Sequence, residues 1–251
     1  MDKSFLSQPQ VIKAARDFIC VRLATYEDAG EAAMLKAVFR GRDPNSLENT
    51  TFCIMSPDGT RQITRSGRSP SFVYQNAVQM AAAMMRLSAQ YKANVKNVTR
   101  DIPKMASVRL ALNVAACDRQ PLLVLRTADA ISMRKLQERM AAVAWGDVFT
   151  GQFIYAATIR DSELAKIKGI QATSHIVVVQ PDQFGQTGSV LSQIPMTATD
   201  AELVGALNLA LTRFQRSGSN YQQDHVARGR RMGILWKTVL PITDGGRSRP
   251  R

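Results

Sequence analysis

The sequence predicts an α/β protein in which mixed β-sheets are flanked by helices, built as two related halves. Short runs of β-branched and aliphatic residues alternate with amphipathic helical patterns, and each half ends in the order strand, strand, helix. The chain has 251 residues, of which 45% are hydrophobic. That length is enough for two domains that each bury a core.

The first half is expected to contain three helices, one separate strand and a β-hairpin. The hairpin prediction rests on Ser56-Pro57-Asp58-Gly59, because Pro presets φ and Gly permits the left-handed conformation of a turn. Apolar residues at steps of three and four predict a long last helix whose methionines pack in the core. The expected elements are helix 9–19, strand 18–23, helix 27–39, strand 50–55, strand 61–65 and helix 73–91.

The second half is expected to add a βαβ unit before the same hairpin and closing helix. Thr199-Asp200-Ala201-Glu202 is a capping box and predicts where the closing helix begins. A βαβ unit followed by a hairpin and a helix indicates a mixed sheet covered on both faces. The expected elements are strand 122–125, helix 132–143, strand 153–157, short helix 161–168, strand 175–180, strand 189–194 and a closing helix that runs from the capping box 199–202 to residue 214.

Four regions are expected along the chain: residues 1–95, a polar linker 96–114, residues 115–216 and a basic tail 217–251. No run approaches the ~20 apolar residues of a membrane helix. The start, Met1-Asp2-Lys3-Ser4, lacks the pattern of a signal peptide. We therefore expect a soluble chain without a membrane span, in an unknown compartment; an export signal upstream of Met1 stays open.

The net charge of +13 favours anionic partners. Basic side chains are spread along the chain and are densest near its C-terminal end. Nucleic-acid binding through these arginines is only a further alternative, because aromatic residues make up 6% of the chain and no recognition motif is present. The arginines of the basic tail are Arg228, Arg230, Arg231, Arg247, Arg249 and Arg251.

The three candidate thiols, Cys20, Cys53 and Cys117, lie far apart in the sequence. This spacing gives no zinc ligand pair, and we expect neither a metal nor a cofactor. Cys20 and Cys53 fall in expected strands, where small thiols are ordinary core residues. If those strands were neighbours, a contact between the two thiols would be structural.

Other catalytic patterns are weak. The sequence has no phosphate-binding loop and no Gly-x-Ser-x-Gly nucleophile motif. The acidic pairs Asp28–Glu31 and Asp161–Glu163 are expected to be solvated helix starts. His175 opens an apolar strand and is expected at the edge of the core.

The first half resembles a known family. Residues 1–11 and 18–23 resemble the segment that follows the Cys-x-x-C of a bacterial subgroup of the thioredoxin-like superfamily. Residues 49–52 and 56–59 resemble the family segment in which a cis-proline opens a strand that ends at a Pro-Asp-Gly turn. The resemblance covers residues 1–90, and residues 115–215 by element order alone. It implies two thioredoxin-like modules, the first lacking its usual first central strand.

The chain departs from this family at the positions that carry its chemistry. It has no Cys-x-x-C, and the first module begins after the place where the motif would stand. Thr50 occupies the expected cis-proline position of the first module. In the second module, residues 126–130 (Arg-Thr-Ala-Asp-Ala) stand where a family enzyme would have its cysteines, and Ser174 stands at the cis-proline position.

Thiol–disulfide exchange requires a thiolate, and the family obtains one at a helix N-terminus that lowers the pKa of a cysteine. No cysteine of this chain falls at an expected strand-to-helix junction. We therefore expect a redox-silent protein without enzyme activity of its own, used for binding or scaffolding with an unknown protein partner. The alternative is a fragment or relative of a thiol–disulfide oxidoreductase whose Cys-x-x-C lies upstream of Met1.

Overall fold

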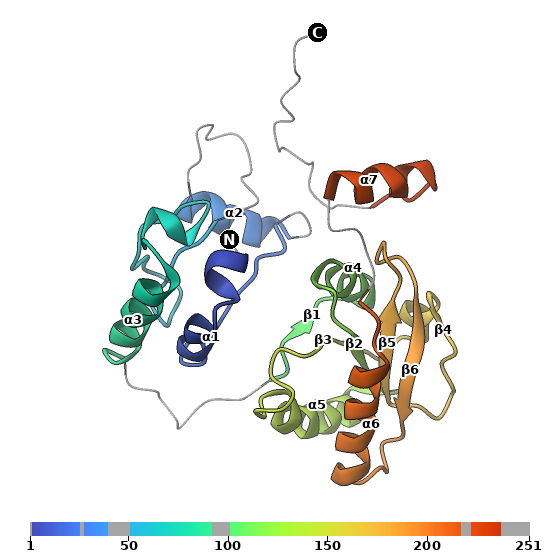
Figure 1. Ribbon diagram of the computed structural model, residues 1–251. Helices are drawn as coiled ribbons and strands as arrows, with labels where there is room; N and C mark the ends of the chain where they lie inside the picture. Colours follow the sequence, from blue (N-terminus) through green and yellow to red (C-terminus); the bar gives the residue numbers. More distant parts are fainter. Residues whose placement is uncertain (1, 26–27, 40–50, 92–100, 217–221, 237–251) are drawn as a thin grey trace. The chain divides into compact units, whose positions relative to one another are not determined.

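The structure, a computed structural model, describes residues 2–25, 28–39, 51–91, 101–216 and 222–236 (Figure 1). It forms two compact units: an N-terminal unit of residues 1–95 and 236–251, and a C-terminal unit of residues 96–235. Within the expected basic tail 217–251, the described residues 222–235 group with the C-terminal unit.

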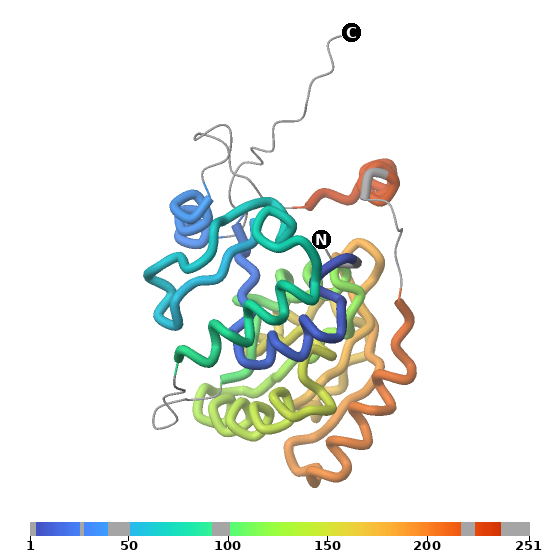
Figure 2. The backbone as a smooth tube through the Cα atoms, turned by 60° about the vertical axis from the view of Figure 1, so that its left-hand side comes forward, coloured from blue at the N-terminus to red at the C-terminus, as the bar shows by residue number. Residues whose placement is uncertain are grey.

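The regular elements of the N-terminal unit, in its described residues, are helices. Its elements are the π-helix η1 (Asp2–Leu6), the α-helices α1 (Pro9–Ala15), α2 (Ala29–Val38) and α3 (Ala77–Ser88), and the 3-10 helix η2 (Pro70–Phe72). Helices α1 and α3 lie side by side (Figure 2). Met80 and Met84 of α3 are buried against Val11 of α1, so the methionines serve the core as predicted.

The expected strand 18–23 is wrong. These residues form no strand, and the side chains of Ile19 and Val21 are 87% and 72% exposed. A sequence rich in β-branched residues becomes a strand only when a neighbouring strand takes up its backbone hydrogen bonds. Among the residues described in this unit, no strand offers that edge.

The expected hairpin is present in reduced form. Two isolated bridges, Phe52 with Gly67 and Met55 with Gln62, join its sides without regular strands. The turn between them has Gly59 at φ +71°. Thr50, at the start of the first side, lies outside the described residues.

The C-terminal unit contains a six-stranded sheet in the described part of the chain, with the order β1-β3-β2-β5-β6-β4. Strands β1, β3 and β2 are parallel, β5 is antiparallel to β2 and to β6, and β4 is parallel to β6. The strands are β1 (Lys104–Met105), β2 (Leu122–Arg126), β3 (Ile154–Thr158), β4 (Ile167–Lys168), β5 (Ile176–Pro181) and β6 (Gly188–Ile194). The helices are α4 (Val108–Asp118), α5 (Ala130–Ala144), the 3-10 helix η4 (Asp161–Leu164), α6 (Asp200–Arg213) and α7 (Gln222–Arg231).

Helices cover both faces of this sheet (Figure 1). Along β2, Leu122 and Val124 belong to the cluster that includes α4, whereas Leu123 and Leu125 belong to the cluster that includes α5 and α6. A strand buried on both faces needs apolar residues at every position, which explains the uninterrupted run 122–125. The predicted mixed sheet with helices on both faces is confirmed here.

Three local predictions in this unit need correction. The expected linker 96–114 contains β1 and most of α4. Ser107 is the N-cap of α4, and its hydroxyl oxygen accepts a hydrogen bond from the Leu110 amide at 3.2 Å. Small alanines on the buried face of α4 weaken its apolar pattern in the sequence. The expected helix 161–168 is the 3-10 helix η4 followed by β4. The expected basic tail 217–251, in which no helix was predicted, contains α7. No helix of the described ranges has the length and apolar character to cross a membrane.

Candidate functional site

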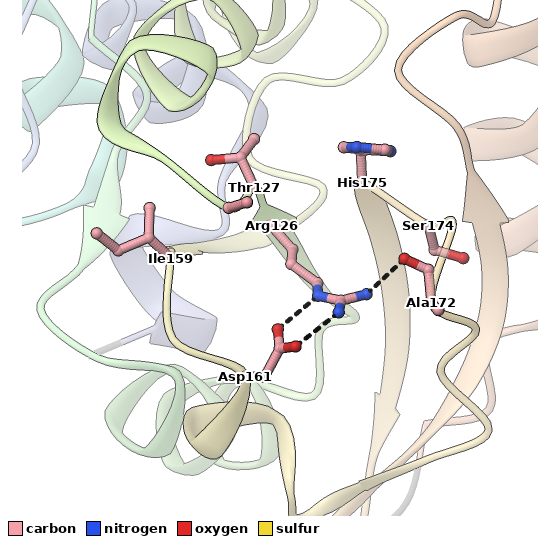
Figure 3. A pocket seen from close by; sticks show the side chains of 8 residues that line it. Arg126, Thr127, Ile159, Asp161, Ala172, Ser174 and His175 are labelled. Carbon is pink, nitrogen blue, oxygen red and sulfur yellow. Dashed lines mark hydrogen bonds and ion pairs between the residues drawn. The ribbon is translucent and has the colours of Figure 1, made fainter.

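A cavity of about 380 Å³ lies where β2 ends and β5 begins (Figure 3). Since β2 and β3 are parallel and β5 runs the other way, the C-terminal ends of β2 and β3 meet the start of β5 at one edge of the sheet. Figure 3 shows Ile159 and Asp161, which follow β3, on one side, and Ala172, Ser174 and His175, which precede β5, on the other. The lining residues are Arg126, Thr127, Ala128, Ile159, Asp161, Ala172, Ser174 and His175.

Arg126, the last residue of β2, ties the two sides of the cavity together. Its Nε donates to Oδ1 of Asp161 at 2.8 Å and its Nη2 to Oδ2 at 2.9 Å. Its Nη1 donates to the carbonyl oxygens of Ala172 at 3.0 Å and Gln171 at 3.3 Å. The hydrogen bonds between Arg126 and Asp161 raise the pKa of Arg126 and lower the pKa of Asp161. The guanidinium is therefore largely engaged by the protein itself.

Thr127 and Ala128, which lead from β2 into α5, form another wall of the cavity. Thr127 is buried, and its hydroxyl donates to the carbonyl oxygen of Asp129 at 2.8 Å. Asp129 is the N-cap of α5 and accepts a hydrogen bond from the Ser132 amide at 2.8 Å. This bond lowers the pKa of Asp129, so a carboxylate already stabilises the positive end of the helix dipole.

The segment that enters β5 is fixed by side-chain hydrogen bonds. Ser174 is buried, and its hydroxyl donates to Oε1 of Gln193 at 2.7 Å. The Gln193 Nε2 donates to the carbonyl oxygen of Gly169 at 3.0 Å. Nδ1 of His175 lies 3.0 Å from the carbonyl oxygen of Thr173. No peptide bond of the described chain is cis, so Ser174 follows a trans peptide.

A second cavity of about 310 Å³ adjoins the first and shares Arg126, Asp161 and Ala172 with it. The ion pair between Arg126 and Asp161 therefore lines both cavities.

The structure brings together the residues expected at the cysteine and cis-proline positions of the second half. Residues 126–128 and Ser174 all line the first cavity, and His175, expected at the edge of the core, lines it as well. Asp161, expected at a solvated helix start, opens η4 with its side chain 72% exposed, and its carboxylate also pairs with Arg126. The sequence offered one signal for this pair: an arginine at the end of a buried strand needs a counter-ion.

No cysteine in the described ranges lines either cavity or forms a disulfide bond. Cys20 is exposed rather than in a core strand, and its Sγ lies 4.0 Å from the carbonyl oxygen of Ala15. Cys53 is half-buried, and Cys117 is exposed on α4. Since residues 18–23 form no strand, the cross-strand contact considered for Cys20 and Cys53 is wrong. Although Cys20 is exposed as a whole residue, partial desolvation of its sulfur raises the pKa of its thiol, and desolvation likewise raises the pKa of the Cys53 thiol.

The remaining expected site residues are found elsewhere. Arg228, Arg230 and Arg231 are exposed on α7, whereas Arg247, Arg249 and Arg251 lie outside the described residues. In the part of the chain that the structure describes, no group of three histidine, cysteine or acidic residues could hold a metal ion.

Comparisons with known protein families, with curated proteins and with solved structures found no match to this chain.

Proposed function

We propose that the chain is a thioredoxin-like protein without redox activity, which binds a protein partner at the first cavity. The order of elements in the C-terminal unit supports the proposal. Strands β1, β2 and β3 alternate with α4 and α5, the hairpin of β5 and β6 follows, and α6 closes the sheet. This is the order expected of a thioredoxin fold with an additional N-terminal strand.

One observation carries the proposal: the positions at which this fold would hold its cysteines and its cis-proline meet at one cavity and have other residues. Arg126, Thr127 and Ala128 stand at the first position and Ser174 at the second. The Thr127 hydroxyl donates to a backbone carbonyl, and the Arg126 guanidinium is paired. No lining side chain supplies a thiolate, which is the nucleophile of disulfide exchange.

Cys20 and Cys53 do not replace the missing pair. The pKa values of Cys20 and Cys53 are raised by burial, so both groups are protonated at neutral pH and are poor nucleophiles. Both belong to the N-terminal unit, whereas the cavity belongs to the C-terminal unit.

The surroundings of the cavity suit a polypeptide partner. Ile159, which lines the cavity, is 50% exposed, and Ile131, three residues after the lining Ala128, is 73% exposed in the first turn of α5. The cavity floor is polar, with Arg126, Thr127 and Ser174. Exposed apolar side chains beside a polar floor fit an apolar side chain of a partner together with its backbone.

The first test is reduction of insulin by dithiothreitol in the presence of this chain and of a version extended to the next upstream start. The proposal expects neither chain to accelerate the reaction. Activity of the extended chain alone would identify this sequence as part of an oxidoreductase. Activity of the present chain would contradict the proposal directly.

The second test concerns binding. Ile159→Asp should abolish capture of the partner by the full chain, because it places a charge on the wall of the cavity. The matched control is Val148→Asp, which changes another exposed apolar residue of the same unit. Equal capture by both variants would show that the partner binds elsewhere.

A further inference from the structure

Helix α7 carries a basic surface that shares no residue with the cavities. Its packed side contains Gly229, which is buried, and His225, whose ring centroid lies 5.0 Å from that of Phe184 in the β5–β6 loop. Arg228, Arg230 and Arg231 are exposed. All three belong to the last turn, where positive charge also complements the helix dipole.

The end of α7 fixes two apolar side chains beside these arginines. Gly233 has φ +74°, its amide donates to the carbonyl oxygen of Arg230 at 3.0 Å, and the Ile234 amide donates to that of Gly229 at 2.9 Å. This pair of bonds is a Schellman cap. On either side of the cap, Met232 is 61% exposed and Leu235 is 80% exposed.

We propose that α7 and its cap bind the surface of an anionic lipid bilayer, with the three arginines on the head groups and Met232 and Leu235 inserted among them. The net charge of +13 gives the chain as a whole an attraction to such a surface. A helix that combines clustered arginines with neighbouring exposed apolar residues is typical of interfacial binding.

The apolar residues favour a bilayer over nucleic acid. A phosphate backbone would pair with the arginines and would leave Met232 and Leu235 in water. At a bilayer surface the same two side chains reach the boundary of the acyl chains, so charge and apolar burial contribute together. The proposal does not depend on the cavity or its partner.

The test is co-sedimentation of the full chain with vesicles of phosphatidylcholine alone or mixed with phosphatidylglycerol, at low and high salt. Binding is expected only to the mixed vesicles, and more weakly at high salt. The variant Arg228→Gln/Arg230→Gln/Arg231→Gln should lower the partition coefficient on the order of 100-fold, since each arginine near an anionic surface contributes about five-fold.

The matched control removes three exposed positive charges elsewhere in the same unit: Arg134→Gln, Lys135→Gln and Arg213→Gln. It should lower partitioning by less than about five-fold, because charges away from the contact are screened. Gln and Arg have similar helix propensities, so circular dichroism should show unchanged helix content in both variants.

A second variant, Met232→Ser/Leu235→Ser, should lower partitioning on the order of ten-fold or more with all arginines present. Absence of binding to the mixed vesicles, equal binding to both kinds of vesicle, or an equal loss in the control variant would overturn the proposal. Retention on duplex DNA without vesicle binding would also overturn it and would assign the arginines to nucleic acid.

Discussion

The two units differ in whether a segment with the composition of a β-strand has neighbouring strands to pair with. In the C-terminal unit, residues 176–179 lie between β2 and β6 and are fully buried. In the N-terminal unit, residues 18–23 have a similar β-branched and aliphatic composition but form no strand. The comparison shows that strand formation depends on a neighbouring edge as much as on residue type.

The largest expected effect is the loss of stability when a buried side chain is shortened, compared with the same kind of change at an exposed one. Leu123→Ala should lower the free energy of unfolding of the C-terminal unit by about 2–5 kcal/mol, because it leaves a cavity beside a fully buried strand. Val21→Ala in the N-terminal unit should change stability by less than about 0.5 kcal/mol, because that side chain is largely exposed. Chemical denaturation followed by circular dichroism measures both; similar losses would mean that residues 18–23 are buried in solution.

The next largest difference is in the stability lost when alanine replaces one of two glycines that have positive φ. An added Cβ at Gly185 would lie 2.7 Å from Cα of Asn113, whereas at Gly59 no atom of the described chain lies within 4 Å. Gly59→Ala should therefore cost about 1–2 kcal/mol from backbone strain alone. Gly185→Ala should cost about 2–4 kcal/mol, because steric overlap adds to the strain. Equal losses in thermal unfolding would contradict the close packing of the β5–β6 loop on α4.

A smaller effect is expected at the cavity. Arg126→Gln removes the hydrogen bonds to the carbonyl oxygens of Gln171 and Ala172 and should destabilise the C-terminal unit by about 1–2 kcal/mol. The control Arg134→Gln breaks an exposed pair with Glu138 and should cost less than about 0.5 kcal/mol. Hydrogen exchange at residues 171–175 should rise only in the first variant; unchanged exchange there would show that Arg126 does not hold this segment.

The smallest effect concerns the hairpin turn of the N-terminal unit. Hydrogen bonds from Ser56 and Thr60 lower the pKa of Asp58 from 3.8 to about 2. Because the folded-state pKa is depressed, the stabilisation is complete above about pH 4 and is lost as the pH falls through about 2. NMR titration of Asp58 and of the Thr60 amide should show this midpoint, and Asp58→Asn should remove it from the amide. A midpoint near 3.8 would mean that the turn does not form.

Long, strongly periodic segments could be predicted from the sequence. Helices α3, α5 and α6 and strands β2 and β5 were predicted close to their observed positions, because their apolar residues recur at a helical period or fill a continuous buried run. The short strands β1 and β4, of two residues each, have no such pattern. Helix α7 is mostly polar, and its packing on Phe184 is not visible in its own sequence.

The site could be predicted only in part. Comparison with the family order pointed to residues 126–130 and Ser174, and the structure brings Arg126, Thr127, Ala128 and Ser174 to one cavity. Asp161 and Ile159 were not predicted as lining residues. They follow β3, and they lie beside Arg126 only because β3 pairs with β2 in the observed register. That register, Arg126 opposite Thr158, follows from strand pairing and not from local sequence.

The N-cap of α5 also limits how this scaffold could acquire a reactive thiol. Thr127→Cys or Ala128→Cys would introduce sulfur beside the first turn of α5, where the Asp129 carboxylate already stands. A neighbouring negative charge raises the pKa of a thiol and offsets the helix dipole that would lower it. An engineered or evolved disulfide catalyst on this unit would therefore require replacement of Asp129 by an uncharged cap as well as the cysteines themselves.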